Sequence, residues 1–244
     1  MCAMGLCMSI DRYTKKIWTA AGCLADHRRV ASQLPFILGA YIGPNAIEPK
    51  LNEAVMVTVN SVNSCPYCKG LHGELARMAG VDDPMGLMDA QSAAECRERI
   101  DEPSITYART FAEQNGRGEI EAKAYASLES VEGPGRARSV RALCWFLTWG
   151  SVGGNTINAL LSRLKGAPKD GSSPIFELAF FVYYAPLFLL IAVVNALLRF
   201  FPQVPAWFSA FFGVVLTFIA GTWILPLGLI SVLLRGRPHV LAAG

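Results

Sequence analysis

Charged residues are nearly absent from the last third of the sequence. Of the 22 Lys and Arg and 19 Asp and Glu in the 244-residue chain, only three basic residues and one acidic residue fall within residues 171–244. The net charge is +3 and no block of Lys and Arg occurs, which argues against a nucleic-acid partner. With 52% apolar residues, the chain is too hydrophobic to be disordered. We expect a folded domain followed by a strongly apolar segment.

The cysteine pattern argues against a disulfide-bonded secreted scaffold. The chain has seven cysteines, an odd number, and only Cys65 and Cys68 form a closely spaced pair. The first ten residues contain no basic residue, so they do not fit a secretory signal peptide. These features favour a reducing compartment. We expect Cys2 and Cys7 to be ordinary free thiols and not sites of acylation.

Two long uncharged stretches follow one another near the carboxyl end. The first stretch is residues 178–198, which are 21 residues long, and the second is residues 200–234, which are 35 residues long. About 20 apolar residues in a helix cross a bilayer core of about 30 Å. We therefore predict transmembrane helices over residues 175–199 and 207–234, joined by a short loop, and not a buried hairpin of a soluble core.

Basic residues flank this hairpin. Arg163, Lys165 and Lys169 precede the first predicted span, and Arg235 and Arg237 follow the second. By the positive-inside rule, the domain ahead of the hairpin and the carboxyl end of a two-pass protein both face the cytoplasm. The uncharged stretch 178–198 and the second span contain no Asp, Glu, Lys or His, which favours a plain anchor in the lipid bilayer over an ion or proton path. The sequence leaves open which membrane is occupied.

The remaining chain divides by composition and periodicity. We assign residues 1–29 to an N-terminal extension, 30–166 to a helical domain, 167–174 to a linker and 235–244 to a basic tail. Apolar residues recur at helical spacing through the domain. Residues 51–62 show some strand-like alternation, but no second strand is nearby, so a helix fits better. The predicted fold is all-α, with about six helices ahead of the hairpin.

The most informative segment is a Cys-Pro-Tyr-Cys motif at residues 65–68, followed by His72. Ser64 suits a helix N-cap and the proline suits the first turn, so a helix should begin near Cys65. On that helix the two thiols and the imidazole lie within an arc of about 60°. The helix dipole favours a thiolate in the first turn, and His72 can accept the proton of Cys68. The pattern predicts a low-pKa nucleophile at Cys68 and a partner able to close a disulfide.

Other interpretations of this cluster were weighed. A c-type haem attachment needs His directly after the second cysteine, where Lys69 stands, so it is excluded. A zinc site formed by Cys65, Cys68 and His72 lacks a fourth ligand from a second Cys-x-x-Cys or a His pair. A cluster without chemistry is disfavoured because a histidine in register makes the motif more specific than an isolated Cys-x-x-Cys. A zinc-binding scaffold stays open as the non-enzymatic alternative.

The same stretch resembles the AhpD-like alkyl hydroperoxidases of the carboxymuconolactone decarboxylase superfamily. Glu53 lies twelve residues before Cys65, and His72 lies four after Cys68, which is the family's spacing of Glu, Cys, Cys and His. The likeness covers roughly residues 30–165. It implies an all-α domain that assembles as a trimer or hexamer and reduces a hydroperoxide substrate without a cofactor. An external dithiol reductant would complete the cycle.

The resemblance also implies residue roles. Cys68 would be the peroxidatic sulfur and Cys65 the resolving sulfur, with His72 receiving the proton and Glu53 acting through His72 or a bound water. Tyr67 stands where peroxidases of the family can have a second histidine, which weakens the expected proton relay. The sequence thus predicts a membrane-anchored, thiol-dependent hydroperoxide reductase. The superfamily's lyase chemistry on a lactone acid is the enzymatic alternative.

The other histidines and cysteines carry no predicted role. His27 and His239 lie in polar stretches, so we expect both to be solvated and not catalytic. Cys23, Cys96 and Cys144 have no partner nearby in the sequence. Cys144 lies in an apolar segment, where a buried thiol behaves as a small hydrophobic group.

Overall fold

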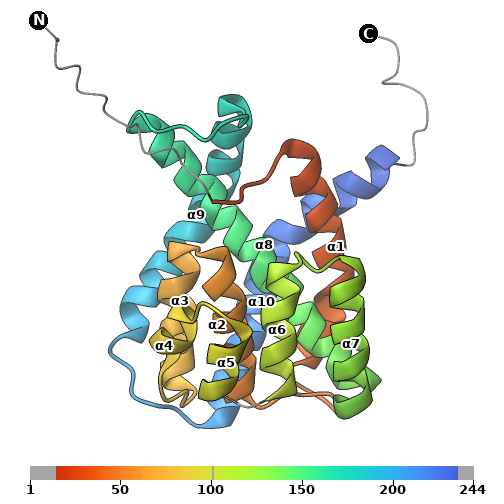
Figure 1. Cartoon of the computed structure of the whole chain (residues 1–244). Coiled ribbons are helices and arrows are strands. Elements are labelled where there is room, and N and C mark those ends of the chain that lie inside the picture. Colours follow the sequence, from red (N-terminus) through yellow and green to blue (C-terminus); the bar gives the residue numbers. More distant parts are fainter. Residues whose placement is uncertain (1–14, 101, 236–244) are drawn as a thin grey trace, which may run out of the picture.

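The fold is built from α-helices. The computed structural model describes residues 15–100 and 102–235, and within these ranges it contains ten helices and no strand (Figure 1). Cys2, Cys7, His239 and all of the basic tail except Arg235 lie outside the described residues. The helices are α1 (Ala20–Gly39), α2 (Pro49–Asn63), α3 (Pro66–Met78), α4 (Pro84–Asp89), α5 (Ala93–Arg99), α6 (Pro103–Glu113), α7 (Gly118–Glu132), α8 (Pro134–Leu164), α9 (Pro174–Leu198) and α10 (Ala206–Arg235).

The all-α prediction is confirmed, with more helices than expected. The helices α1–α8, which we call the head, number eight where about six were predicted. The additional ones include the short helices α4 and α5. Helix α1 begins at Ala20, inside the segment assigned from the sequence to an N-terminal extension.

Helix α2 runs through the centre of the head. Every residue from Leu51 to Asn60 is buried, and the helix packs against α3, α4, α6 and α8. A helix that is covered on all sides has no polar face, so its sequence lacks a clear amphipathic period. This explains the strand-like alternation over residues 51–62, and the preference for a helix there is confirmed.

The junction between α2 and α3 positions the cysteine pair. Ser64 has a left-handed backbone, with φ of 53°, and ends α2. Cys65 is the N-cap of α3, and its Sγ accepts the backbone N–H of Cys68. The predicted start of the helix is confirmed, but the assignment of Ser64 as its N-cap is wrong. Because Ser64 turns the chain out of α2, the capping position passes to the next residue.

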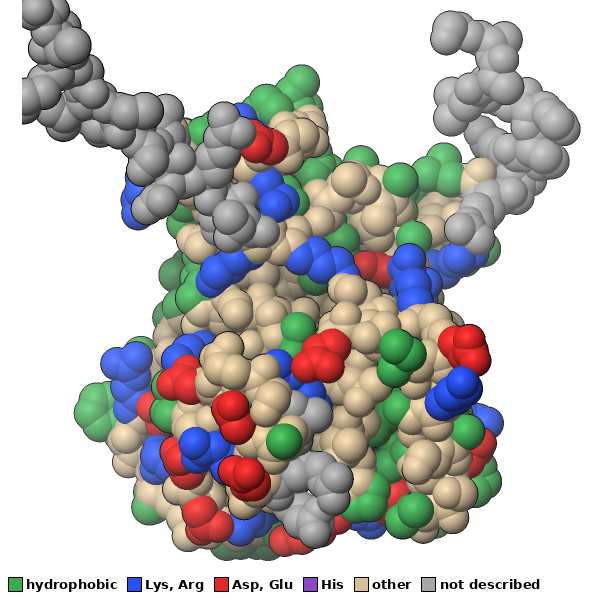
Figure 2. All heavy atoms as spheres, in the orientation of Figure 1, with side chains coloured by type: hydrophobic (Ala, Val, Ile, Leu, Met, Phe, Trp, Pro, Cys, Tyr) green, Lys and Arg blue, Asp and Glu red, His purple; other side chains and the backbone are tan. Residues whose placement is uncertain are grey.

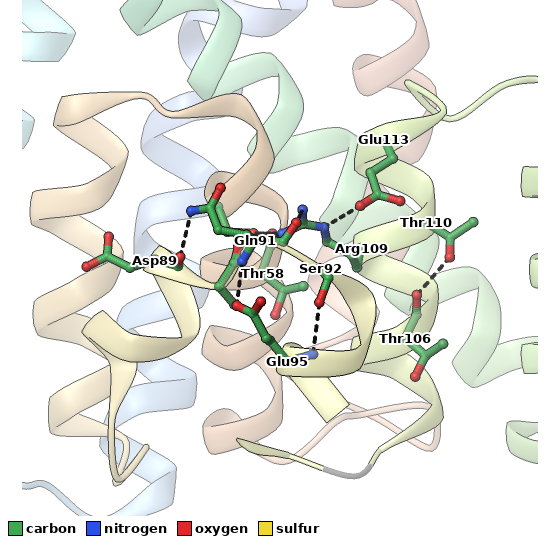
Figure 3. Close-up of polar contacts among 11 residues, drawn as sticks. Thr58, Asp89, Gln91, Ser92, Glu95, Thr106, Arg109, Thr110 and Glu113 are labelled. Atoms are coloured by element: carbon green, nitrogen blue, oxygen red, sulfur yellow. Dashed lines mark hydrogen bonds and ion pairs between the residues drawn. The ribbon is translucent and has the colours of Figure 1, made fainter. Parts of the chain in front are cut away.

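Buried Arg109 on α6 fastens the loop after α4 (Figure 3). Its guanidinium donates hydrogen bonds to the carbonyl oxygens of Ala90 and Gln91 and pairs with Glu113, with an Nε–Oε1 distance of 2.6 Å. It also donates to the Ser61 hydroxyl on α2. The five donors of a guanidinium suit such a junction. Arg109 therefore joins α2, α6 and the α4–α5 connection into one framework.

Helices α9 and α10 pack against the head along their length. Helix α9 lies on α3 and α8, and α10 lies along α1; both are behind α4–α7 in Figure 1. At one end of α9, Arg163 of α8 pairs with buried Glu177, with an Nε–Oε2 distance of 2.7 Å. At the other end, Arg77 of α3 donates to the carbonyl oxygens of Leu198 and Phe201. Helix α9 is thus bonded to the head at both ends.

Helices α9 and α10 are linked at two levels along their length, at their connecting loop and at Tyr183 and Trp223, and they lie apart between these two levels. The connecting loop is held by a hydrogen bond from Val204 N–H to the Met78 carbonyl, 3.0 Å long. Farther along, the Tyr183 hydroxyl and the Trp223 indole N–H each donate to the other residue's carbonyl oxygen, at 3.1 Å. Between these levels the two helices make few direct backbone contacts. Each of them rests on the head instead of on its neighbour.

The surface is divided into a charged side and an apolar side. Figure 2 shows Lys, Arg, Asp and Glu side chains scattered over the helices in front, which include α4–α7. Both C-terminal helices are long and apolar enough to cross a membrane. Their outer faces expose large apolar side chains, among them Leu178, Val182, Leu189, Val193, Leu197, Phe211, Phe218, Leu225 and Leu229.

A candidate redox site at the start of α3

Glu53 and His72 form a buried pair inside the head. Glu53 comes from α2 and His72 from α3, and the distance from His72 Nδ1 to Glu53 Oε2 is 2.9 Å. The two residues are 6% and 9% exposed. An ionised carboxylate can only accept a hydrogen bond, so this contact holds a proton on Nδ1 and leaves Nε2 to exchange protons. The structure therefore brings together the two residues that the motif spacing had linked.

The two thiols lie in the first turn of α3. Cys65 is completely buried and Cys68 is 7% exposed, and both are free thiols. The N–H of Cys68 donates to Cys65 Sγ over 3.3 Å. Helix α8 passes very close at Gly154, where an added Cβ would lie 2.6 Å from Cys65 Sγ. Only a residue without a side chain at this position leaves room for the sulfur.

Two polar side chains fix the pair from neighbouring helices. The Asn60 amide on α2 accepts from Cys65 N–H over 3.1 Å and donates to the Cys65 carbonyl over 3.3 Å. The Ser151 hydroxyl on α8 lies 3.6 Å from Cys68 Sγ and 3.4 Å from Asn60 Oδ1, and its single proton can be donated to either of them. The sulfurs are thus held by a hydrogen-bonded network from α2, α3 and α8.

Hydrogen bonding within the pair favours a thiolate at Cys65. Although burial opposes ionisation, the Cys68 thiol and the backbone N–H groups of Cys68 and Tyr67 lower the pKa of Cys65. The hydrogen bond to Cys65, together with burial, raises the pKa of Cys68 well above its usual value. Two sulfurs this close share one proton and titrate as a pair. The expected low pKa of Cys68 is therefore not found, because the N-cap position belongs to Cys65.

An apolar cavity of about 90 Å³ adjoins the site. Cys68, His72 and Glu53 line it, whereas Cys65 does not. Within the described residues no hydrogen bond joins Cys68 to His72, so the two face a common space without direct contact. The rest of the wall comes from α2, α3, α8, α9 and α10, together with Trp18 and Tyr41. A ligand in this cavity would meet Cys68 first, with Cys65 behind it.

The cluster does not have the geometry of a metal centre. Across residues 15–100 and 102–235, no three His, Cys, Asp or Glu side chains form a group that could hold a metal ion. Cys65, Cys68 and His72 are included in that statement. This finding gives the zinc-binding alternative no geometric support.

His27 is buried, so the prediction that it is solvated is wrong. Its Nδ1 bonds to the Cys23 carbonyl oxygen over 2.6 Å, and its Nε2 accepts the Trp149 indole N–H over 2.9 Å and contacts the Tyr184 hydroxyl. Burial lowers the pKa of His27 to about 4. The adjacent Arg28-Arg29 pair suggested a polar surface, but these arginines lie on a different side of α1 from the buried His27.

The three remaining described cysteines behave as hydrophobic residues. Cys23, Cys96 and Cys144 are all buried and unbridged. Burial raises the pKa of Cys23 to about 12 and that of Cys144 well above its usual value. The expectation that Cys144 is a small buried hydrophobic group is confirmed.

Sequence reasoning missed several parts of the site. Asn60 and Ser151 lie far from the motif and form no pattern with it, so only the fold reveals their contacts. The hairpin residues that line the cavity, such as Ile191 and Leu216, were assigned to lipid by composition alone. The contact of Tyr184 with His27 had no signal in the sequence.

Comparison with known proteins adds no relatives. No family model, no curated protein and no solved structure matches the chain.

Proposed function

We propose that the protein is a thiol-dependent hydroperoxide reductase that uses Cys68 and Cys65, with His72 and Glu53 handling protons. One observation supports this more than any other. Cys68, His72 and Glu53 line one apolar cavity, and the second sulfur is within hydrogen-bonding distance of the Cys68 backbone N–H. A substrate oxygen placed there would contact a nucleophile and an acid at once.

The first step forms a sulfur–oxygen bond at Cys68. The Cys65 thiolate takes the shared proton, and the Cys68 thiolate attacks the terminal oxygen of the hydroperoxide. The O–O bond breaks with its electron pair going to the leaving oxygen, which receives a proton from His72 and departs as an alcohol. Glu53, 2.9 Å from His72, stabilises the imidazolium before the transfer. Cys68 is left as a sulfenic acid.

The second step closes a disulfide. Cys65 attacks the sulfenic sulfur of Cys68, the S–O bond breaks, and the hydroxyl leaves as water with the proton that Cys65 had taken up. The protein has then lost two electrons to the peroxide. An external dithiol, which exchanges with the Cys65–Cys68 disulfide, restores the reduced pair. The cycle needs no cofactor.

Tyr67 contributes shape more than proton transfer. It lines the cavity and packs edge-on against Phe188 of α9, with ring centroids 5.3 Å apart. Burial raises its pKa above the usual value, so its hydroxyl stays protonated at neutral pH. Proton delivery in the proposed cycle therefore depends on His72 and Glu53.

The test follows peroxide consumption and the state of the two sulfurs in the full-length protein. Peroxide should convert the reduced protein to a Cys65–Cys68 disulfide, identified by mass spectrometry of the linked peptide. Cys68→Ser should abolish consumption, and Cys65→Ser should stop the cycle after one turnover at a sulfenic acid trapped by a dimedone probe. Cys96→Ser, at a buried cysteine outside the cavity, is the matched control and should retain the rate. A Cys68→Ser protein with an unchanged rate refutes the proposal.

The proposed enzyme works at a lipid bilayer. Scattered apolar side chains are normal on a protein surface, but a continuous apolar face along two helices is typical of a membrane or a partner. The charged residues over α4–α7 remain in water on the other side. The positive-inside pattern supports a head on the cytoplasmic side of the membrane. Assembly into a trimer or hexamer stays a prediction.

The loop between α9 and α10 decides how the hairpin meets the bilayer. A two-pass hairpin puts residues 199–205 across the membrane from the head, whereas Arg77 and Val204 hold this loop against the head. These contacts support a hairpin that lies with its outer face in the bilayer beside the head. In sealed vesicles, Gln203→Cys should react with an impermeant maleimide from the same side as Lys123→Cys on exposed α7. Reaction from opposite sides would establish the two-pass topology instead.

A further inference from the structure

We infer that α9 and α10 form part of the substrate site and that the cavity between them and the head binds the hydrocarbon chain of a long-chain hydroperoxide. This inference rests on the proposed peroxidase function and adds the substrate class. It also gives the C-terminal helices a role in selecting the substrate, beyond attachment to a membrane.

The position of the cavity carries the argument. Leu187, Ile191 and Val194 of α9 and Leu216, Ile219 and Ala220 of α10 line it. All six lie between the two levels at which the helices are joined, the Tyr183–Trp223 hydrogen bonds and the Val204–Met78 hydrogen bond. At about 1.5 Å per residue, the part of the α9 wall from Leu187 to Val194 extends about 10 Å. The separation of the helices thus leaves an apolar space that Cys68 also lines.

The chemistry of the wall selects an apolar chain. Glu53 and His72 are the only ionisable lining residues besides Cys68 and the tyrosines, and they are paired with each other. Lys and Arg are absent from the lining residues, so a carboxylate or phosphate would lack a cationic partner inside. The cavity of about 90 Å³ has room for a few methylene groups, so the segment of the hydrocarbon chain next to the hydroperoxide group lies against the aliphatic and aromatic wall and the rest of the chain stays outside. The acidic headgroup of such a molecule would stay outside.

The cavity also reaches the apolar outer surface. Leu190 of α9 lines the cavity and is 38% exposed, so the same side chain touches the interior and the surface that faces lipid in the proposed function. A chain that enters here leaves one apolar environment for another and loses little hydration. Access between α9 and α10 therefore suits a substrate dissolved in a bilayer.

The reaction in this cavity is the balanced two-step cycle given above. The carbon chain keeps its length, the O–O bond is broken, and the oxygen that remains on the chain leaves as an alcohol. The other oxygen passes through the Cys68 sulfenic acid and leaves as water when the disulfide forms. The alcohol product keeps the full hydrocarbon chain, so it should occupy the same cavity and can serve as an unreactive probe.

The test fills the cavity from the hairpin side. Leu216→Trp places a larger side chain in the wall, and Phe218→Trp is the control on the same helix, because Phe218 is 63% exposed and does not line the cavity. Ile191→Trp and Leu189→Trp form a second matched pair on α9. Two readouts are recorded in detergent: protection of Cys68 from iodoacetamide by oleyl alcohol, and kcat/KM for linoleic acid hydroperoxide, phosphatidylcholine hydroperoxide and hydrogen peroxide.

We expect oleyl alcohol to protect Cys68 in the unsubstituted protein and in both control variants, but not in the cavity variants. The cavity variants should lose roughly tenfold or more in kcat/KM for the long-chain hydroperoxides, a change typical of an altered apolar pocket, and keep their rate with hydrogen peroxide. A larger loss with phosphatidylcholine hydroperoxide than with the free acid would identify the membrane lipid as the source.

Failure of this inference differs from failure of the proposed function. If oleyl alcohol gives no protection and all peroxides are reduced equally by every variant, the chain-binding inference is overturned while the peroxidase assignment holds. If the alcohol protects Cys68 selectively but no peroxide is consumed, the cavity binds a hydrocarbon chain and the peroxidase assignment is wrong.

Discussion

Acid should loosen the contact between α1, α8 and α9, because His27 at their junction cannot be protonated without losing a hydrogen bond. Its Nδ1 already binds the Cys23 carbonyl oxygen, which places the imidazole proton there. Its Nε2 accepts the Trp149 N–H at 2.9 Å. A second proton on Nε2 would put two donors face to face in a site with no exposed surface. Burial lowers the pKa of His27 to about 4, and the opposed Trp149 donor adds to the cost of the second proton.

The sign and size of the effect follow from linkage. An unfolded chain has the ordinary histidine pKa of 6.5, so it takes up the proton before the folded protein does. The contribution of His27 to stability is therefore complete above about pH 6.5 and is lost as the pH falls toward about 4. At about 1.4 kcal/mol per pH unit, this interval corresponds to a loss of about 3 kcal/mol. For a chain of this size that lowers Tm by roughly 6–12 °C.

Thermal unfolding of the full-length protein in detergent, followed by tryptophan fluorescence between pH 7.5 and pH 4, measures this loss. Carboxylates also titrate near the lower limit, so the comparison with His27→Gln isolates the histidine contribution. The Gln variant should be less stable at pH 7.5 but should lose less stability on acidification. Trp149→Phe removes the competing donor and should move the loss toward pH 6.5. An acid-dependent loss in His27→Gln equal to that of the unsubstituted protein would refute the reasoning.

Three further predictions concern the cysteine site. Glu53→Gln should lower kcat for peroxide reduction by roughly 10²-fold, within the range of a lost acid–base contribution, while peroxide still oxidises the thiols slowly. Gly154→Ala should destabilise the protein by about 1–3 kcal/mol through crowding, and it should slow disulfide formation. In Gly150→Ala the added Cβ would lie 3.9 Å from Cys68 Sγ, so this variant should gain up to about 1 kcal/mol in helix propensity. Urea unfolding measures the free energy of unfolding of both variants, which should change in opposite directions. Cys65→Ala removes the main cause of the raised Cys68 pKa, so the pKa of Cys68, read from the pH dependence of alkylation, should fall.

The helices and the residues of the motif could be predicted from local rules. Proline and glycine mark the ends of several helices, and the one-turn spacing of Cys68 and His72 is a property of any helix. What local rules missed is the backbone turn at Ser64, which depends on how α2 and α3 meet. A left-handed residue there moves the N-cap to Cys65. The negative charge of the pair therefore belongs to a different sulfur from the one that the spacing alone suggested.

The environment of His27 could not be predicted for a similar reason. Neighbours in the sequence place it in a polar stretch, yet its partners Trp149 and Tyr184 come from positions more than a hundred residues away. One side of α1 meets α8 and α9 while Arg29 on another side pairs with Asp26. Composition alone predicts that a helix with one buried side and one charged side is solvated. The burial of single residues depends on tertiary packing, which composition does not contain.

The polar residues of α9 indicate that the sequence of this helix is suited to packing on the head. Glu177, Tyr184 and Asn195 lie on an otherwise apolar helix, and each of them faces the head. Glu177 meets Arg163, Tyr184 meets His27, and the Asn195 amide lies so close to α3 that a Cβ at Gly70 would be 2.7 Å from it. A helix surrounded by lipid would expose these groups to hydrocarbon at a cost of several kcal/mol each. Helix α9 therefore has one side suited to the head and another suited to lipid, and the cavity lies between them.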